Sequence, residues 1–465
     1  MYVVVVVVVC VWSFRAGRSR QGGPLFWQRV ALPVPSVLAA VPRLNRSPRP
    51  RLADPIQPSS SCVSHTDFHH SSGGGYDFHR DMGAKCGHGC SENAVEAYGN
   101  YSTHVFTDEA LRVIDTYAAA AEVSGSDTQE PKGLFLYLAY QAVHSPAQCP
   151  DSYVKPYAKS IKDDERRFFA GMISAMDEGV ANVTGALEKH AMLNDTLVIF
   201  ISDNGGPTNQ HPKTDAIGST NFPLRGGKHA IWEGGTRATA VVSGAGVPAQ
   251  GNYTNLMYVT DLYPTILDAV QVTPLPSQPP LSGSSHWPLL SAPDEHKGNA
   301  GPRDEIYYGH PVPGTPAKPV DMRNGSSALR LDDPVNNRKW KLVNGTGGDP
   351  SDWWPLVTDE KPKPKPGASS GVSSAGKLHL FDLVSDPEER NDVASLNPRV
   401  VADLGARLQR ALATERPTSA NEPACKALQK AGVFFVNETR VPEGKAWTTW
   451  CDNATDYAEN GTAAQ

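Results

Sequence analysis

The chain has 465 residues, of which 20% are charged, and a formal net charge of -6 at pH 7. This length suffices for one large domain with a smaller one, and the weakly acidic balance lacks the basic excess by which proteins bind nucleic acid. Its seven cysteines are too few for a fold built on disulfides.

Residues 1–61 predict no folded element. Tyr2 to Phe14 are apolar and include a run of valines, but Arg15, Arg18 and Arg20 follow the run, which is the reverse of a secretory signal. The run is shorter than the roughly 20 residues that cross a bilayer, so we expect no stable membrane span. The remainder, rich in Pro, Arg and Ser, is expected to be disordered or to come from a mispredicted gene start.

Histidines and cysteines crowd the segment that follows. The irregular spacing of its histidines among Ser and Gly favours a surface loop over a metal site; they are His65, His69, His70, His79 and His88. In an oxidising compartment the candidate disulfides join Cys86 to Cys90 or to Cys62, and Cys425 to Cys451. A zinc site at Cys86, His88 and Cys90 lacks a fourth ligand at a suitable spacing, so disulfides are favoured.

A helix is predicted to begin at Thr107 or Asp108, either of which can cap it, with Leu111, Ile114 and Ala118 on one face.

Two buried strands and a long helix come next. Residues 133–140 and 196–202 are apolar runs typical of parallel strands. Between them, Asp163 to about His190 has apolar residues at three- and four-residue steps: Phe168, Met172, Met176, Val180, Val183 and Leu187. The crossover that joins two parallel strands brings both carboxyl ends to one edge of the sheet.

Polar residues follow both predicted strands. Asp203 and Asn204 precede a turn at Gly205, and their oxygens make a hard pair suited to Ca²⁺ or Mg²⁺. His144 follows the first strand, just before Pro146, so we expect it at the same crevice. A solvated Asp-Asn-Gly turn and a structural histidine remain the alternative on these segments alone.

The glycine-rich segment 221–237 carries several cationic residues: Arg225, Lys228, His229 and Arg237. Glycines permit close backbone approach, so such a loop suits an oxyanion such as sulfate or phosphate. A loop with solvated charges is an equally good interpretation.

A second module is predicted from about Pro274. Its strand-like segments lie at 304–308, 327–331, 338–343 and 378–382. A helix from about Pro398 to Thr414 would pack on this small antiparallel sheet. The Lys-Pro and Gly/Ser-rich insertion at about 349–376 predicts a solvated loop.

Sequons of the form Asn-X-Ser/Thr predict a glycoprotein of the secretory pathway, extracellular or lysosomal. They lie at Asn45, Asn100, Asn182, Asn194, Asn252, Asn324, Asn344, Asn437, Asn453 and Asn460.

Five segments, taken in order, resemble the sulfatase family and within it the type I arylsulfatases of the arylsulfatase B kind. They are 133–146, 168–177, 202–206, 223–228 and 232–237, with further likeness at 259–265, 340–343 and 380–390. The resemblance implies an α/β fold: an alkaline-phosphatase-like sandwich with a mixed, largely parallel central sheet, plus a small C-terminal α+β subdomain with an antiparallel sheet. It makes 62–273 a partial catalytic domain and 274–465 the C-terminal subdomain, with 1–61 unassigned.

The resemblance also implies a function, sulfuric ester hydrolysis with Ca²⁺ on a sulfated aryl compound or glycan. Asp203 and Asn204 match the family's second pair of calcium ligands. Lys228 matches the lysine that holds the sulfate and bridges to the nucleophile, and His144 matches the histidine near the leaving oxygen.

Other family motifs are missing from their expected places. Sulfatases carry an Asp-Asp pair near the N-terminus, a Cys-X-Pro-X-Arg motif whose cysteine becomes the formylglycine nucleophile, and a Lys-X-His pair. No Cys or Ser here has Pro two residues on and Arg four residues on, and Asn221 stands in the cysteine's place before Pro223 and Arg225. We therefore expect no nucleophile and no turnover.

Three interpretations follow. The first is a sulfatase whose N-terminal strands are missing from this sequence. The alternative is a non-catalytic secreted glycoprotein that keeps the fold. Phosphoester hydrolysis is weaker, because it would need a different nucleophile and more metal ligands.

Overall fold

The computed structural model describes part of the chain, in two compact units. The described residues are 3–9, 78–81, 91–123, 133–144, 147–208, 218–248, 251–274, 280–293, 300–309, 326–333, 336–348, 350–354, 377–413, 435–437 and 445–447. Unit 1 comprises Met1–Asn45 and Phe106–Glu415, and unit 2 comprises Arg46–Val105 and Arg416–Gln465. Both the region up to 273 and the region beyond it contribute to unit 1, and the boundary at 273 stays a prediction.

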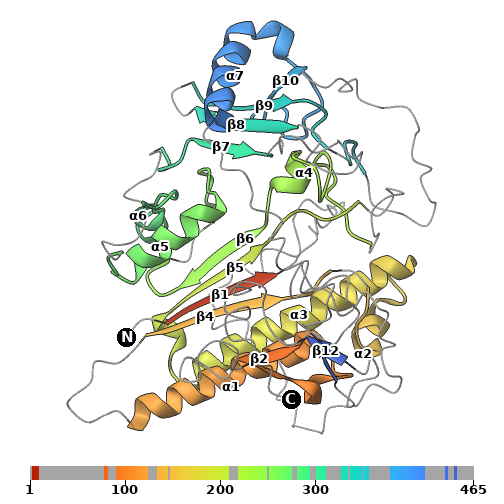
Figure 1. The fold of residues 1–465 in the computed structure, drawn as a ribbon, viewed down its shortest axis with the longest axis vertical. Helices are drawn as coiled ribbons and strands as arrows, with labels where there is room; N and C mark the ends of the chain where they lie inside the picture. Colours follow the sequence, from red (N-terminus) through yellow and green to blue (C-terminus); the bar gives the residue numbers. More distant parts are fainter. Residues whose placement is uncertain are drawn as a thin grey trace. The chain divides into compact units, whose positions relative to one another are not determined.

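Unit 1 contains a four-stranded sheet with the order β4-β1-β5-β6 (Figure 1). Its strands are β1 (Val3–Val9), β4 (Leu134–Tyr140), β5 (Thr196–Ser202) and β6 (Ala240–Gly244). The first three are parallel and β6 is antiparallel to β5, which confirms the predicted mixed, largely parallel sheet. Val9 pairs with both Tyr140 and Ser202, so the carboxyl ends of the three parallel strands are level.

The valine run at the start of the chain is a strand, where the sequence predicted no element. Val3–Val9 lies between β4 and β5 and pairs with both. The prediction of no folded element is therefore wrong for these seven residues. Uninterrupted β-branched residues suit the centre of a parallel sheet.

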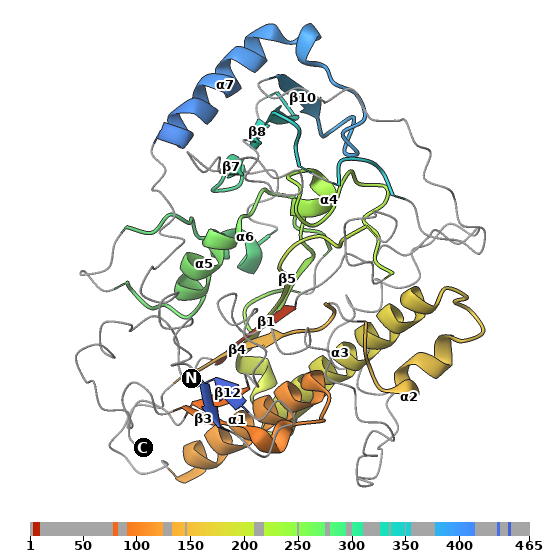
Figure 2. The same cartoon turned by 45° about the vertical axis from the view of Figure 1, so that its right-hand side comes forward.

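Two helices lie along one face of this sheet, as Figures 1 and 2 show: α1 (Ser102–Val123) and α3 (Asp164–Lys189). The bounds of α3 confirm the prediction, and the carboxylate of Asp163 caps it by accepting from the Arg166 amide at 2.8 Å. Helix α1 begins earlier than predicted. Thr107 lies within α1 and does not cap it. Its side chain is buried, and its hydroxyl lies 2.7 Å from the Tyr140 hydroxyl.

Among the described residues, α5 (Leu262–Ala269) and α6 (Trp287–Ser291) cover the opposite face of the sheet on the β5 side. They pack on the buried side chains of Leu197 and Ile199 of β5. Phe135 and Tyr137 of β4 are in register with those two residues through β1, yet they are 60% and 58% exposed. The strand at 133–140 is therefore half buried, in contrast to the prediction.

The C-terminal part of unit 1 is an antiparallel sheet of order β10-β9-β8-β7. Its strands are β7 (Glu305–Tyr308), β8 (Ser327–Asp333), β9 (Arg338–Asn344) and β10 (Leu378–Asp382). Helix α7 (Pro398–Ala413) lies beside this sheet (Figure 2). Its Leu404 and Leu408 pack on the leucines of β8, β9 and β10. The predicted antiparallel sheet with one C-terminal helix is confirmed.

The remaining elements are short. Unit 1 also has α2 (Asp151–Val154), α4 (Glu233–Thr236) and 3₁₀ turns at Lys155–Tyr157, Leu193–Asp195, Val259–Asp261 and Ala394–Leu396. Unit 2 has two antiparallel pairs, β2 (His79–Asp81) with β3 (Ser91–Asn93) and β11 (Phe435–Asn437) with β12 (Lys445–Trp447), and a turn at Val95–Ala97.

Several predictions fall outside the described residues: the rest of 1–61, the disulfides of Cys62, Cys86, Cys90, Cys425 and Cys451, and most of the 349–376 insertion. Within the described ranges, no helix combines the length and hydropathy needed to cross a membrane.

Candidate functional site

The level ends of β4 and β5 bring the predicted site residues to one edge of the sheet. His144 follows β4 by four residues, and Asp203 and Asn204 follow β5 directly. All three residues therefore follow strands whose carboxyl ends lie at one edge of the sheet.

Lys228 reaches this edge from the glycine-rich segment. Its Nζ lies 2.7 Å from Nε2 of His144, and both side chains are half-buried. A lysine ammonium can only donate, so in that form the imidazole nitrogen is the acceptor. The ammonium keeps further N–H donors besides the one directed at the imidazole, so it can hold an oxyanion beside this pair.

Asp203 and Asn204 supply oxygens of the type that Ca²⁺ and Mg²⁺ prefer. Asp203 is exposed, and its Oδ1 accepts from the Asn204 amide at 2.7 Å. The Asn204 carboxamide donates through Nδ2 to the Gly205 carbonyl at 2.9 Å, a bond that does not use its oxygen. The donor chemistry therefore fits a hard cation.

The number of donors is lower than such a cation takes. Calcium binds six to eight oxygens in proteins. Across the ranges that the structure describes, no group of three His, Cys, Asp or Glu residues could hold a metal ion. Asp203 and Asn204 alone therefore supply fewer oxygens than a complete site for such a cation needs.

Close backbone contacts join the loop after β5 to the segment 221–237. The Gly205 amide donates to the Gly235 carbonyl at 2.9 Å, and the Lys228 amide donates to the Gly206 carbonyl at 3.0 Å. A Cβ added at Gly205 would lie 1.7 Å from the carbonyl oxygen of Gly234. Glycine is required here because the backbones leave no room for a side chain.

Arg225 does not take part in the site, in contrast to the expectation that it brings positive charge to this edge. It is 1% exposed, and its guanidinium lies 3.7 Å from the Trp232 ring centre and 4.8 Å from that of Trp353. It donates to the Ser351 carbonyl at 2.7 Å. An arginine between two indoles is held by stacking and desolvation, which the spacing of charges in a sequence does not reveal. His229 and Arg237 are exposed.

A buried charge cluster fixes the same segment to the C-terminal sheet, and the sequence did not predict it. Nζ of Lys341 on β9 lies 3.0 Å from a Glu233 carboxylate oxygen and 2.9 Å from one of Glu389. Burial alone would lower the pKa of Lys341, but the two carboxylates outweigh burial and raise it. The Glu233 amide also donates to Glu389 at 2.7 Å.

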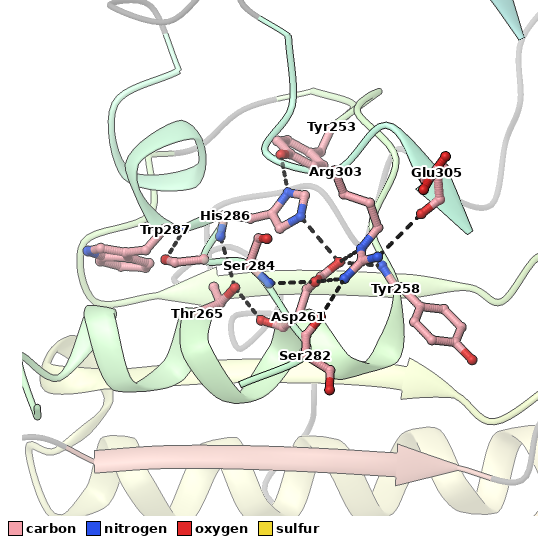
Figure 3. Close-up of polar contacts among 11 residues, drawn as sticks. Tyr253, Tyr258, Asp261, Thr265, Ser282, Ser284, His286, Trp287, Arg303 and Glu305 are labelled. Atoms are coloured by element: carbon pink, nitrogen blue, oxygen red, sulfur yellow. Dashed lines mark hydrogen bonds and ion pairs between the residues drawn. The ribbon is translucent and has the colours of Figure 1, made fainter. Parts of the chain in front are cut away.

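A second polar network joins the turn before α5 to the segment before β7 (Figure 3). Asp261 is fully buried and accepts from Nε and Nη2 of Arg303, each at 2.7 Å. Nε2 of His286 lies 3.4 Å from the same carboxylate, and its Nδ1 lies 2.6 Å from the Tyr253 hydroxyl. The buried carboxylate paired with Arg303 indicates a structural role for this network.

Cys149 is the one cysteine among the described residues, and it is not a nucleophile. It is buried, its thiol donates to the Phe168 carbonyl at 3.8 Å, and burial raises its pKa to about 12. A thiol with that pKa is almost entirely protonated at neutral pH.

Comparison with known proteins gives consistent similarities. The family model described as Sulfatase matches residues 58–272. Arylsulfatase J of Mus musculus is 34% identical over 343 residues, which cover 70% of this chain and 52% of that protein. The uncharacterized sulfatase YdeN of Escherichia coli (strain K12) is 30% identical over 192 residues, 41% of this chain and 31% of that protein. The chain spans about half the length of these relatives, or less.

Among solved structures, the crystal structure of Ps i-CgsB matches with a TM-score of 0.50 and 24% identity, covering 71% of this chain and 60% of that one. This similarity bears on the fold alone. With the family match, it confirms the predicted α/β fold class of alkaline-phosphatase-like architecture.

Proposed function

The chain belongs to the sulfatase family, and from that premise we propose that its site binds the sulfate group of a sulfuric ester through Lys228 and His144. The reaction class is sulfuric ester hydrolysis, and the ligand is a sulfated aryl compound or a sulfated glycan. The contact of 2.7 Å between Lys228 Nζ and His144 Nε2 carries the proposal.

The chemistry of these two groups suits sulfate. An ammonium stabilises negative charge on the sulfate oxygens, and an imidazole beside it can contact the ester oxygen that leaves. Both groups come from loops that lie on a rigid sheet edge, so their spacing is set by the fold and not by the ligand.

A calcium ion is the cofactor that we propose for Asp203 and Asn204, with magnesium as the alternative. When bound, such an ion neutralises charge on the sulfate oxygens. The two side chains supply hard oxygens but fewer ligands than calcium takes. We therefore expect weak metal binding in this chain.

Turnover is not expected, because the sequence contains no Cys-X-Pro-X-Arg motif to supply a formylglycine. The alternative function is that of a non-catalytic glycoprotein that keeps the sulfatase fold. The sequons favour passage through the secretory pathway to an extracellular or lysosomal location in either case.

Titration of the full chain with inorganic sulfate by isothermal calorimetry tests the proposal. Wild-type protein is expected to bind, and Lys228→Ala should weaken binding roughly tenfold or more, the effect of losing one charge-assisted contact. The control is Lys189→Ala, which removes a lysine paired with Asp115 at 3.1 Å on the surface. No binding by wild type, or equal losses in both variants, would refute the proposed site.

A further inference from the structure

The buried side chain of Asn221 hydrogen-bonds to the loop after β5 and to the glycine-rich segment. It is 2% exposed, and among the described residues its carboxamide bonds to backbone groups of the two loops that carry the candidate site residues. Oδ1 accepts from the Gly206 amide at 2.8 Å, and Nδ2 donates to the carbonyls of Gly206 at 2.7 Å and Gly226 at 3.1 Å.

Gly206 connects Asn221 to both halves of the site. It stands two residues after Asn204, and its carbonyl oxygen accepts from the Lys228 amide at 3.0 Å as well as from Asn221. Gly226, the third partner of the carboxamide, stands two residues before Lys228. One buried side chain thus joins the backbone that carries the metal-ligand pair to the backbone that carries the lysine.

The hydrogen bonds at position 221 require a carboxamide. The three bonds need one acceptor and two N–H donors on one planar group, and among residues of this size only asparagine supplies them. A carboxylate of the same shape would accept from the Gly206 amide but would face two carbonyl oxygens without a proton to offer. A Cβ at Gly227 would lie 2.8 Å from Nδ2, so the space around the carboxamide is closed.

We propose that Asn221 is the positioning residue of the sulfate site, which holds Lys228 at its distance from His144 and from the Asp203-Asn204 pair. The proposal rests on the proposed function. Asn221 itself touches none of the four side chains that would meet the ligand. It acts through the backbone of Gly206 and of the Gly226 to Lys228 turn.

The test is Asn221→Asp in the full chain, with two readouts. The first is the ¹⁵N resonance of the His144 imidazole at fixed pH, assigned by its loss in His144→Asn, which reports the contact with Lys228 without any ligand. We expect Asn221→Asp to move this resonance toward its position in Lys228→Ala. The second is the affinity for inorganic sulfate, expected to fall about tenfold, the effect of disturbing one or two hydrogen bonds.

A double-variant cycle separates positioning from general destabilisation. In a Lys228→Ala background, Asn221→Asp should have no further effect on sulfate affinity, because there is no lysine left to position. The matched control is Thr265→Val, which removes a buried hydroxyl that bonds the Asp261 carbonyl at 2.6 Å and the His286 amide at 3.0 Å, and it should leave the His144 resonance in place.

The outcomes are distinct. An unchanged His144 resonance in a folded Asn221→Asp protein, or an equal shift in Thr265→Val, overturns the positioning role. If wild type binds no sulfate while the resonance moves as expected, the positioning role stands and the proposed function fails. Should Asn221→Asp not fold, Asn221→Ser, which keeps a shorter hydroxyl donor and acceptor, is expected to move the resonance in the same direction.

Discussion

Nζ of Lys228 and Nε2 of His144 lie 2.7 Å apart although the two residues are separated by 84 positions in the chain. The lysine belongs to a glycine-rich turn and the histidine to the loop after β4. Their contact exists because β4 and β5 end at the same level and because the turn is tied to the loop after β5 by backbone hydrogen bonds.

The purified chain is expected to bind sulfate without hydrolysing a sulfate ester. The sequence has no formylglycine motif, and the described cysteine is buried and protonated. Release of nitrocatechol from nitrocatechol sulfate is the measurement. Saturable release that Lys228→Ala abolishes would contradict this expectation.

Gly205→Ala is expected to destabilise the protein by about 3 kcal/mol or more, because a Cβ there would lie 1.7 Å from the Gly234 carbonyl oxygen. Gly185→Ala on α3 is the matched control: an added Cβ meets nothing within 4 Å, and the loss of glycine from a helix should stabilise by roughly 0.5–1 kcal/mol. The urea midpoints of unfolding of both variants provide the measurement. A similar shift in both would contradict the prediction and show that the backbones around Gly205 and Gly234 can move apart.

Lys341→Met is expected to reduce the free energy of unfolding by about 3–5 kcal/mol, because it leaves Glu233 and Glu389 buried without their shared cation. The triple variant with Glu233→Gln and Glu389→Gln should recover part of that loss, since neutral amides do not repel one another. Thermal and chemical unfolding of the three proteins provide the measurement. No recovery in the triple variant would mean that packing, and not charge, determines the effect.

Stability should fall as the pH falls below about 6.5, in part through His286. Burial lowers the pKa of His286 from its ordinary value of 6.5, so the unfolded chain binds the proton more readily than the folded one. Its contribution is therefore complete above the unfolded pKa and is lost as the pH falls through the folded pKa. Urea midpoints at pH 7.5, 6.5 and 5.5 should fall less steeply in His286→Asn than in wild type, and equal slopes would contradict the prediction.

Glycan occupancy should follow the exposure of the sequon asparagines. Asn100, Asn182, Asn194 and Asn252 are exposed, whereas Asn344 is half-buried in β9 and its Nδ2 donates to the Ser327 hydroxyl at 3.4 Å. Peptide mass spectrometry of protein secreted from a eukaryotic host should find glycans at the first four and not at Asn344. A glycan at Asn344 would show that modification precedes folding of β9.

The sequence predicted well wherever a local pattern determines structure. The spacing of apolar residues predicted helix α3, strand β5 before Asp203, and helix α7 on its antiparallel sheet. The sequence predicted poorly where a partner distant in the chain decides. Arg225 lies between Trp232 and Trp353, and Thr107 bonds Tyr140 in place of capping a helix.

The seven residues of β1 are identical, which gives the strand no sequence information about its own alignment. In most strands a slip of one residue exchanges the side chains of the two faces, but here it replaces valine with valine. Each such slip would move the strand's end by about 3.3 Å relative to Tyr140 and Ser202. The valines themselves therefore do not determine the register of β1 with β4 and β5. Replacing Val6 with a single larger residue would make one register different from the others.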